Sequence, residues 1–200
     1  YNGASSVPGN LRIERSTINN NTASTDGGGI YSEGTFYGEN STVYANTADN
    51  NGGGVYFDSG MATFLNMTVA YNTANMGGGV YIATDASLTS YNSIIAYNTT
   101  SDSGASVSWN DLYASSTDNY SIESSYNLIG YSYVGSAEGY FSFDYSSDLF
   151  SGLLADNGGW TKSLALANFT GTLDGWSLVD DEYYASPTKV PASVWYEQGD

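Results

Sequence analysis

The carboxylates are the side chains of this sequence that could carry acid–base chemistry. Histidine and cysteine are absent from the 200 residues, so the commonest general base and all thiol chemistry are excluded. Hydrolysis of polysaccharides uses two carboxylates about 5–10 Å apart. The aspartates of the first half instead occur singly near corners: Asp26, Asp49, Asp58 and Asp85. A lyase would need a lysine or arginine base, and none occurs between Arg15 and Lys162. We therefore expect no enzymatic activity.

Cation binding has only weak support in the sequence. The run Asp180-Asp181-Glu182 joins three acids, but a solvated loop accounts for it better than a catalytic or metal-binding group. Neither an EF-hand loop nor the calcium-binding nonapeptide repeat occurs. We expect no cofactor. Weak Ca²⁺ binding through oxygen, at Asp49-Asn50-Asn51 or at the acidic run, is the alternative.

The net charge of −17 limits the partners that this chain can bind. Only four residues are basic, against 21 acids. Phosphate groups need cationic side chains, so nucleic-acid binding is not expected, and anionic membrane surfaces are disfavoured for the same reason. No apolar run approaches the roughly 18 residues of a membrane span. We expect a mature secreted protein that is extracellular, either free or attached to the cell surface.

A repeat of about 25 residues organises the first half of the chain. Three glycine triplets recur in step with a second motif, read as STINNNTA, STVYANTA, MTVAYNTA and SIIAYNTT. The triplets are Gly27-Gly28-Gly29, Gly52-Gly53-Gly54 and Gly77-Gly78-Gly79. The asparagines of the second motif are Asn21, Asn46, Asn72 and Asn98. Each glycine triplet is followed by an aliphatic residue and a tyrosine.

This period, with short β-type runs and no sustained helical pattern, predicts an all-β parallel solenoid with one coil per repeat. Equivalent residues should then stack in columns. The predicted inward columns are Ile18/Val43/Val69/Ile95, Ile30/Val55/Val80 and Ala23/Ala48/Ala74, with Phe36, Phe64 and Leu88 in the same interior. The glycines and asparagines should form the corners. Glycine permits positive φ and close backbone approach, while asparagine tolerates positive φ and can hydrogen-bond along its column.

Tyrosines are the most distinctive side chains predicted to face outward. Tyr31, Tyr56 and Tyr81 each follow an inward aliphatic residue by one position, and Tyr71 and Tyr97 lie nearby in another row. Stacking that merely stabilises the coils is one interpretation. A contact face for a neighbouring subunit or for sugar rings is the other, because aromatic side chains offer rigid surface.

The repeat resembles a known group of proteins. The strings GGGIYSEGTFYGENSTVYANTA and GGGVYFDSGMATFLNMTVAYNTA are similar to polymorphic outer-membrane-protein repeats, which occur in right-handed parallel β-helix proteins of bacterial surfaces. Gly29, Gly54 and Gly79 replace the alanine of that family's corner. YNLIG at residues 126–130 and DLFSGLLADNGGWTKSLAL at residues 148–166 resemble the segment that follows the coils in secreted, variably anchored β-helix proteins. The resemblance implies the right-handed fold and an extracellular setting, and it carries no catalytic motif.

We divide the chain into four parts: an entry or cap segment (1–10), regular coils (11–104), irregular closing coils (105–166) and an aromatic acidic tail (167–200). Six or seven coils are expected in all. The tail either caps the last coil or docks on another subunit through Trp176, Tyr183, Tyr184, Trp195 and Tyr196. Asn119 and Asn168 are the candidate glycosylation sites among the Asn-X-Ser/Thr sequons. Asn98 is also in a sequon, but its place in the corner column argues against a glycan there.

Three functions follow from these features. The first is a non-catalytic extracellular structural protein that self-associates as a homo-oligomer or homopolymer, in the form of a filament or a surface-layer or matrix subunit. The second is a carbohydrate-binding or adhesive surface module, acting on glycans through the tyrosines. A polysaccharide-degrading enzyme is the third and is least supported, because the carboxylates are not paired.

Overall fold

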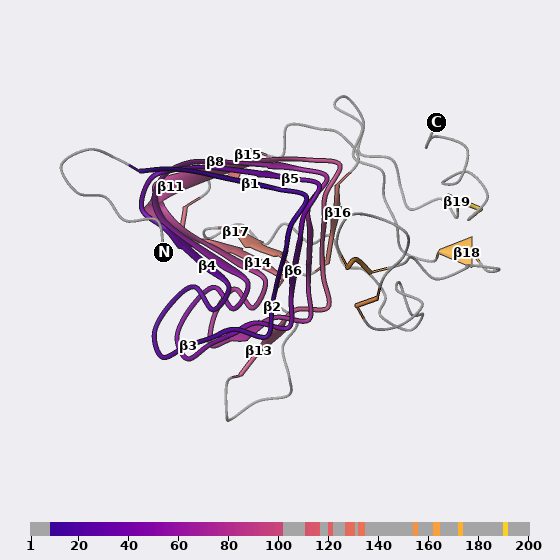
Figure 1. The fold of residues 1–200 in the computed structure, drawn as a ribbon, viewed down its shortest axis with the longest axis horizontal. Coiled ribbons are helices and arrows are strands. Elements are labelled where there is room, and N and C mark those ends of the chain that lie inside the picture. Colours follow the sequence, from indigo (N-terminus) through magenta and orange to yellow (C-terminus); the bar gives the residue numbers. More distant parts are fainter. Residues whose placement is uncertain are drawn as a thin grey trace.

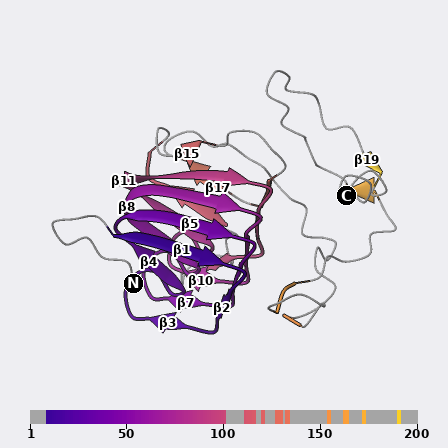
Figure 2. The ribbon, with the colours of Figure 1, turned by 45° about the horizontal axis from the view of Figure 1, so that its top comes forward.

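The computed structural model describes residues 9–101, 111–116, 120–121, 127–130, 132–134, 154–155, 162–164, 172–173 and 190–191. Every regular element in these residues is a β-strand. Figure 1 looks along a stack of coils, so that successive coils overlie one another around a shared interior. Figure 2 shows the same strands turned, as parallel rungs. The described residues make about four turns, so the all-β solenoid predicted from the repeat is confirmed.

Three parallel sheets form the sides of the stack. The first contains β1 (Asn10–Glu14), β4 (Ile30–Ser32), β5 (Thr35–Glu39), β8 (Val55–Leu65), β11 (Val80–Tyr91), β14 (Leu112–Ala114), β15 (Tyr120–Ser121) and β17 (Ser132–Val134). The second contains β2 (Thr17–Asn19), β6 (Thr42–Tyr44), β9 (Thr68–Ala70), β12 (Ile94–Ala96) and β16 (Leu128–Ile129). The third contains β3 (Thr22–Ala23), β7 (Thr47–Ala48), β10 (Thr73–Ala74) and β13 (Thr99–Thr100). A separate antiparallel pair joins β18 (Thr172–Leu173) to β19 (Val190–Pro191).

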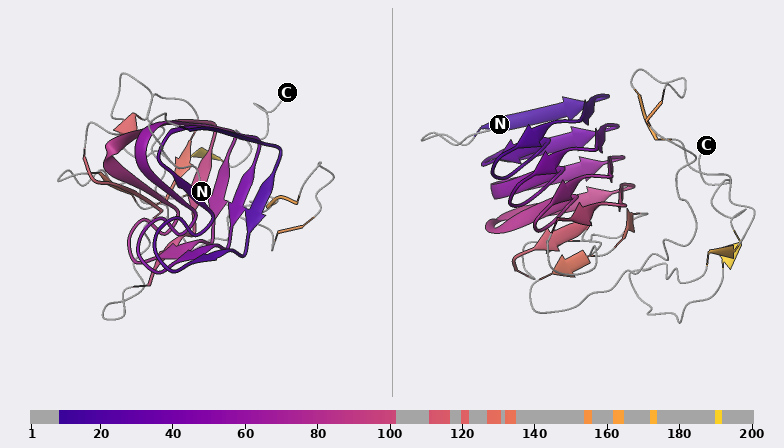
Figure 3. Two further views of the ribbon diagram at one scale, coloured as in Figure 1. Left: turned by 60° about the vertical axis from the view of Figure 1, so that its left-hand side comes forward. Right: turned by 90° about the horizontal axis from the view of Figure 1, so that it is seen from below.

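We number the coils by their strands. Coil 1 is β1–β3, coil 2 is β4–β7, coil 3 is β8–β10 and coil 4 is β11–β13. The strands β14–β16 belong to coil 5, of which the structure describes only parts. Register confirms the predicted stacking, since Ile30 pairs with Val55 and Val55 with Val80. On the second sheet the offset is 26 residues where Val43 pairs with Val69. Figure 3 shows the coils from the side as successive layers.

The interior consists of the predicted apolar columns. Val43, Val69 and Ile95 are fully buried, and Ile129 of coil 5 extends their column. Phe36, Phe64 and Leu88 are also buried, as predicted. They belong to two columns, however, because Phe36 and Leu88 each pair with Ala62 rather than with Phe64.

Each coil turns its corners on residues with positive φ. The first glycine of every triplet takes this conformation, with φ of 69° at Gly27, 63° at Gly52 and 57° at Gly77. A second corner column consists of Arg15, Asn40, Asn66 and Asn92, and a third of Asn20, Ala45, Tyr71 and Tyr97. Asn21, Asn46, Asn72 and Asn98 follow the third column by one residue and have no positive φ. The left-handed conformation, which asparagine tolerates, is therefore taken at this corner by the residue before each of these asparagines.

The stack continues beyond the regular repeats. β14, β15 and β16 pair with coil 4, and β17 pairs with β14. Much of the region expected to hold further coils, residues 105–166, lies outside the described residues. A short segment at residues 162–164 lies against the second sheet. There Thr17 Oγ1 donates to the Lys162 carbonyl at 2.7 Å, and Leu164 packs against a cluster that contains Ala70 and Ala96.

Candidate functional site

The outward tyrosines of the first sheet form one continuous stack. Tyr31 lies in β4, Tyr56 in β8, Tyr81 in β11 and Tyr113 in β14. Their ring centroids are 5.2, 5.1 and 4.9 Å apart in that order, with interplanar angles of 15°, 12° and 9°. We call these four residues the tyrosine column. The predicted aromatic column is thus confirmed by the structure.

The sequence repeat did not predict Tyr113. Residues 102–110 interrupt the glycine pattern, yet Tyr81 pairs with Tyr113 in the same parallel register. The backbone of Tyr133 in β17 then pairs with Tyr113. The signal available in the sequence was the dipeptide Leu112-Tyr113, which repeats the aliphatic–tyrosine pair of the earlier coils.

Carboxylates accompany the tyrosine column. The Tyr31 hydroxyl donates to Glu33 Oε1 at 3.1 Å, and the Tyr56 hydroxyl donates to Asp58 Oδ1 at 3.3 Å. Partial burial raises the pKa of Tyr31 and of Tyr56, and the nearby Asp58 charge raises both further. Burial also raises the pKa of Tyr81. The phenols therefore stay protonated and neutral well above neutral pH.

The stacking geometry decides which parts of these rings a ligand could reach. Sugar rings usually bind tyrosine through the aromatic face. In the tyrosine column the face of each ring lies against the next ring, about one strand spacing away. The column therefore presents ring edges and hydroxyl–carboxylate pairs to its surroundings.

Tyr71 and Tyr97 form a second stack, with centroids 5.4 Å apart and an angle of 11°. Tyr44 contacts Tyr71 edge to face. Tyr97 is only 8% exposed and packs with Ala70 and Ala96, whereas Tyr71 is 38% exposed. Tyr97 therefore cannot serve in the exposed contact face proposed for it from the sequence, because the apolar cluster on the second sheet encloses it.

The corner asparagines form a continuous hydrogen-bonded ladder inside the stack. In each step the backbone N–H and the side-chain Nδ2 of one asparagine both donate to Oδ1 of the next. The Nδ2–Oδ1 distances are 2.9 Å from Asn21 to Asn46, 3.0 Å from Asn46 to Asn72 and 2.9 Å from Asn72 to Asn98. Asn46, Asn72 and Asn98 are fully buried. The predicted hydrogen bonding along this column is confirmed, and burial of Asn98 excludes it as a glycan acceptor in the folded chain.

The second and third glycines of each triplet are required by close approach between coils. A Cβ on Gly29 would lie 2.7 Å from the Gly54 carbonyl oxygen and 2.9 Å from Asn46 Nδ2. A Cβ on Gly54 would meet Gly79 O and Asn72 Nδ2 in the same way. The triplets therefore serve the ladder beside them, and their role in this protein is structural.

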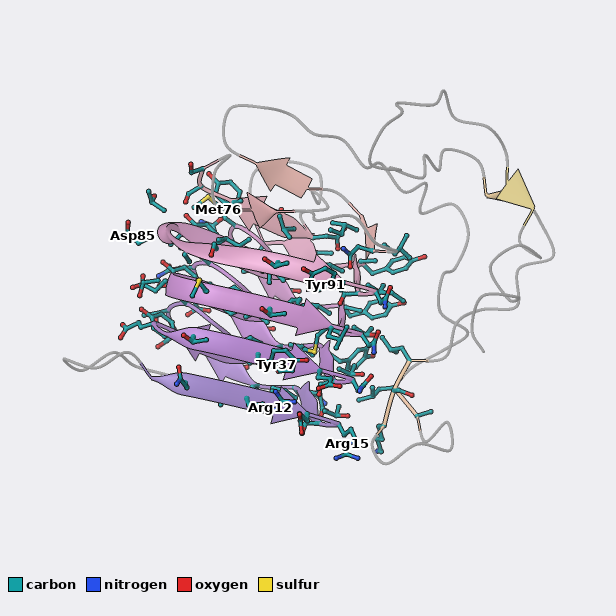
Figure 4. All side chains as sticks on the ribbon, turned by 90° about the horizontal axis from the view of Figure 1, so that it is seen from above. Arg12, Arg15, Tyr37, Met76, Asp85 and Tyr91 are labelled. Carbon is teal, nitrogen blue, oxygen red and sulfur yellow. The ribbon has the colours of Figure 1, made fainter. Side chains whose placement is uncertain are left out.

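The outer face of the first sheet carries mixed side chains (Figure 4). The Arg12 guanidinium lies 4.3 Å from the centre of the Tyr37 ring and pairs with Glu14 and Glu39. Met61 on the same face is 68% exposed. The Arg12 guanidinium is therefore held on this sheet by one cation–π contact and by two carboxylates.

Several predicted site residues lie outside the described residues. These are the tail aromatics Trp176, Tyr183, Tyr184, Trp195 and Tyr196, and the candidate glycan acceptors Asn119 and Asn168. Among the residues that are described, no three acidic side chains come together as a metal ligand set. Weak calcium binding stays a prediction. Within the same residues, no helix is long and apolar enough to cross a membrane.

Comparison with known proteins gives one family match. Residues 15–33 match the model of the Chlamydia polymorphic membrane protein repeat. These residues run from the turn after β1 through the first glycine triplet to the turn after β4, so the match covers the corner motif of the coil. The chain is a β-helix repeat protein similar to this family. No curated protein and no solved structure matches it. The match and the solenoid together confirm the resemblance drawn from the repeat strings.

Proposed function

We propose that this chain is a non-catalytic structural protein of the bacterial cell surface that self-associates, as a filament or as a surface-layer or matrix subunit. The polymorphic membrane protein repeat supports a surface setting. The observation that carries the structural role is the unbroken set of ladders through the stack, in which apolar, asparagine and tyrosine columns tie each coil to the next. Such a body is rigid and repeats one surface along its length.

Three carboxylates of the coils, those of Asp26, Glu33 and Asp58, support a structural role, because neighbouring side chains already donate hydrogen bonds to them. Asp26 accepts hydrogen bonds from both the N–H and Nδ2 of Asn51, at 3.0 and 2.9 Å. Glu33 and Asp58 accept the tyrosine hydroxyls. These three acids therefore stabilise the coils, Asp26 by joining two of them and Glu33 and Asp58 by holding a tyrosine hydroxyl, which is a different use from a general acid–base pair about 5–10 Å apart across a substrate.

The self-association can be tested directly on the purified chain. Light scattering over a wide concentration range and electron microscopy should show dimers or larger ordered assemblies, at low and at physiological salt. The two salt conditions matter because a chain of charge −17 repels its copies more strongly when screening is weak. Monodisperse monomers at every concentration and salt level would rule out the self-associating structural role.

A carbohydrate-binding or adhesive module is the second candidate, and the tyrosine column favours it. Hydroxyl–carboxylate pairs at Tyr31–Glu33 and Tyr56–Asp58 repeat along the stack and could accept and donate hydrogen bonds to sugar hydroxyls. A glycan array should then give hits that weaken in Tyr56→Phe, which removes the hydroxyl but keeps the stacked ring. Binding that is absent, or equal in the two proteins, would remove this candidate.

A further inference from the structure

Asn51 and Gly52 form the dipeptide in which asparagine loses its side-chain amide most readily. In an Asn-Gly pair the glycine nitrogen can attack the side-chain carbon Cγ of the asparagine, and glycine has no side chain to hinder the attack. The sequence contains two further Asn-Gly pairs, at residues 2–3 and 157–158, and both lie outside the described residues. Asn51-Gly52 is therefore the one Asn-Gly pair within the described coils.

The fold requires glycine at position 52. Its φ is 63°, and a Cβ there would lie 2.5 Å from a carbonyl oxygen of β8. The equivalent residues of the neighbouring turns are Gly27 and Gly77, but they follow Asp26 and Met76 instead of asparagine. Among the three glycine turns, the reactive pair thus occurs only in the turn between coil 2 and coil 3.

The neighbouring turns hold every group that would react. The Gly52 N–H donates to the Met76 carbonyl at 3.0 Å. Asp26 Oδ1 accepts both the Nδ2 and the backbone N–H of Asn51, at 2.9 and 3.0 Å. The Asn51 carbonyl accepts the Gly27 N–H at 3.0 Å. Figure 1 shows these turns overlying one another between the third sheet and the first. Ring closure needs the glycine nitrogen to lose its proton and turn toward Cγ, so the packed turns oppose it.

We propose that Asn51-Gly52 is a deamidation site that the packing of the turns keeps unreactive until the coils open locally. In the opened turn the Gly52 nitrogen bonds to Asn51 Cγ while the Cγ–Nδ2 bond breaks, and ammonia leaves with the proton of the glycine nitrogen. Water then opens the succinimide ring. Attack of water on Cγ gives aspartate, and attack on the main-chain carbonyl carbon gives isoaspartate. The proposal does not depend on self-association.

Either product would oppose closure of the turn. Aspartate at position 51 would place a carboxylate against Asp26 in place of the amide that donates to it, so an attractive contact would become a repulsion between like charges. Isoaspartate would lengthen the main chain by one carbon atom beside Gly53. That residue is fixed on both sides, since its N–H donates to the Gly77 carbonyl and its carbonyl accepts the Gly29 N–H. The reaction therefore converts a brief opening into a permanent loss of this contact.

Peptide mapping by mass spectrometry tests the protection. The purified chain is incubated in neutral buffer, either folded or in guanidinium, and the deamidated fraction of each Asn-Gly pair is followed with time. In guanidinium all three pairs should react at similar rates, which makes the other two a reference for the chemistry. In the folded chain Asn51 should react at least about tenfold more slowly than in guanidinium, because the reaction needs local opening. Equal rates at Asn51 in the two conditions, or no reaction there in guanidinium, would overturn the proposal.

Asp26→Ala tests the contact that holds the amide. Without the carboxylate the Asn51 side chain is released, so the folded variant should deamidate at Asn51 about three- to tenfold faster than the wild type. Asp49→Ala is the matched control, because it removes an exposed carboxylate from the same turn and should leave the rate unchanged. Circular dichroism would check that each variant is folded. A wild-type rate in folded Asp26→Ala would overturn the proposed role of the contact.

Asp26→Asn keeps the test decisive if Asp26→Ala does not fold. It retains an acceptor oxygen for the Asn51 amide and should therefore stay protected. Reaction of Asn51 in folded Asp26→Asn at the rate seen in guanidinium would overturn the proposal.

Asn51→Asp reproduces the charge of one product. It should lower the midpoint of chemical denaturation and speed hydrogen exchange at the amides of Gly27 and Gly52, which bridge the turns. The double variant Asp26→Asn with Asn51→Asp again places an amide donor opposite a carboxylate, so it should recover most of the lost midpoint. An unchanged midpoint in Asn51→Asp would overturn the permanent loss of the contact.

Discussion

At the scale of single residues, Asn51 marks the point where one column of side-chain hydrogen bonds between coils, which begins at Asp26, is interrupted. Asn51 donates to Asp26 of the preceding coil, but its own Oδ1 is buried without a partner among the described residues. The residue paired with it in the next coil is Met76, whose side chain has no N–H to donate. The hydrogen bonding from Asp26 to Asn51 is therefore not continued to Met76 in the next coil.

Met76→Asn should extend this column. The new amide would donate to Asn51 Oδ1 in the way that Asn51 donates to Asp26, so we expect a gain of about 1 kcal/mol in the free energy of unfolding. Chemical denaturation would measure it. Met61→Asn, on the open face of the first sheet, is the control and should change stability by less than about 0.5 kcal/mol. Equal effects in both variants would show that the hydrogen bond is not the cause.

Substitution of the third glycine of a triplet should instead lower the free energy of unfolding. Polymorphic membrane protein repeats resemble this corner but carry alanine there. In this chain a Cβ on Gly54 would lie 2.6 Å from the Gly79 carbonyl oxygen and 2.9 Å from Asn72 Nδ2. Gly54→Ala should therefore destabilise the fold by about 1–3 kcal/mol through overpacking. A thermal unfolding midpoint equal to that of the wild type would contradict the close approach.

At the scale of elements, much of the architecture follows from the sequence, because stacking converts a linear period into columns. Ile18, Val43 and Val69 could be aligned from the repeat alone, and their burial follows from alternation along a strand. The sequence placed Asn72 at a corner and noted that asparagine tolerates positive φ, yet Tyr71 is the residue that takes this conformation. Propensity was outweighed there by the ladder, which needs the Asn72 amide pointing along the stack.

The candidate site was predicted less completely. Tyr56 and its stacked neighbours were found from the aliphatic–tyrosine pair, but Tyr113 was missed because residues 102–110 change the spacing of the repeat. Asp111 could not be predicted as the acceptor of the Asn98 amide. Asp111 precedes Leu112 and so stands at the register position of the third glycine of a triplet, and only the fold shows that its carboxylate accepts the Asn98 amide as a further asparagine would. The burial of Tyr97 likewise depends on packing over the second sheet.

The tyrosine column makes the elements of the first sheet sensitive to alkali. The pKa values of Tyr31, Tyr56 and Tyr81 are raised in the folded chain, mainly by partial burial. A raised folded-state pKa means that the folded chain holds these protons after the unfolded chain has released them. Stability from this source is therefore complete below about pH 10, the ordinary tyrosine value, and is lost as the pH rises above it.

Absorbance at 295 nm during an alkaline titration would follow this loss. We expect a fraction of the phenols to ionise only when the circular dichroism signal of the sheets is lost. In Tyr56→Phe this late fraction should become smaller, because one member of the column no longer titrates. Ionisation of all tyrosines near pH 10 with the fold intact would contradict the protection inferred from the stack.

At the scale of the whole molecule, the stack behaves as a one-dimensional array whose stability is the sum of coils and of contacts between neighbours. The asparagine ladder can test this description, because Asn21 in coil 1 has a ladder neighbour in one described coil and Asn72 has neighbours in two. Asn72 is fully buried, donates to Asn98, accepts from Asn46 and also donates to the Val43 carbonyl. Asn21 is exposed and serves one neighbouring coil.

Asn72→Ala should therefore cost about 2–4 kcal/mol, because it leaves buried donors and an acceptor unpaired on both sides, whereas Asn21→Ala should cost about 1 kcal/mol. Native-state hydrogen exchange would separate the two effects. Loss at Asn21 should loosen β2 and β3 alone, while loss at Asn72 should lower protection in the coils on both sides, since each coil is held by its neighbours. Equal costs at the two positions would mean that the coils unfold as one indivisible unit, and the array description would then fail.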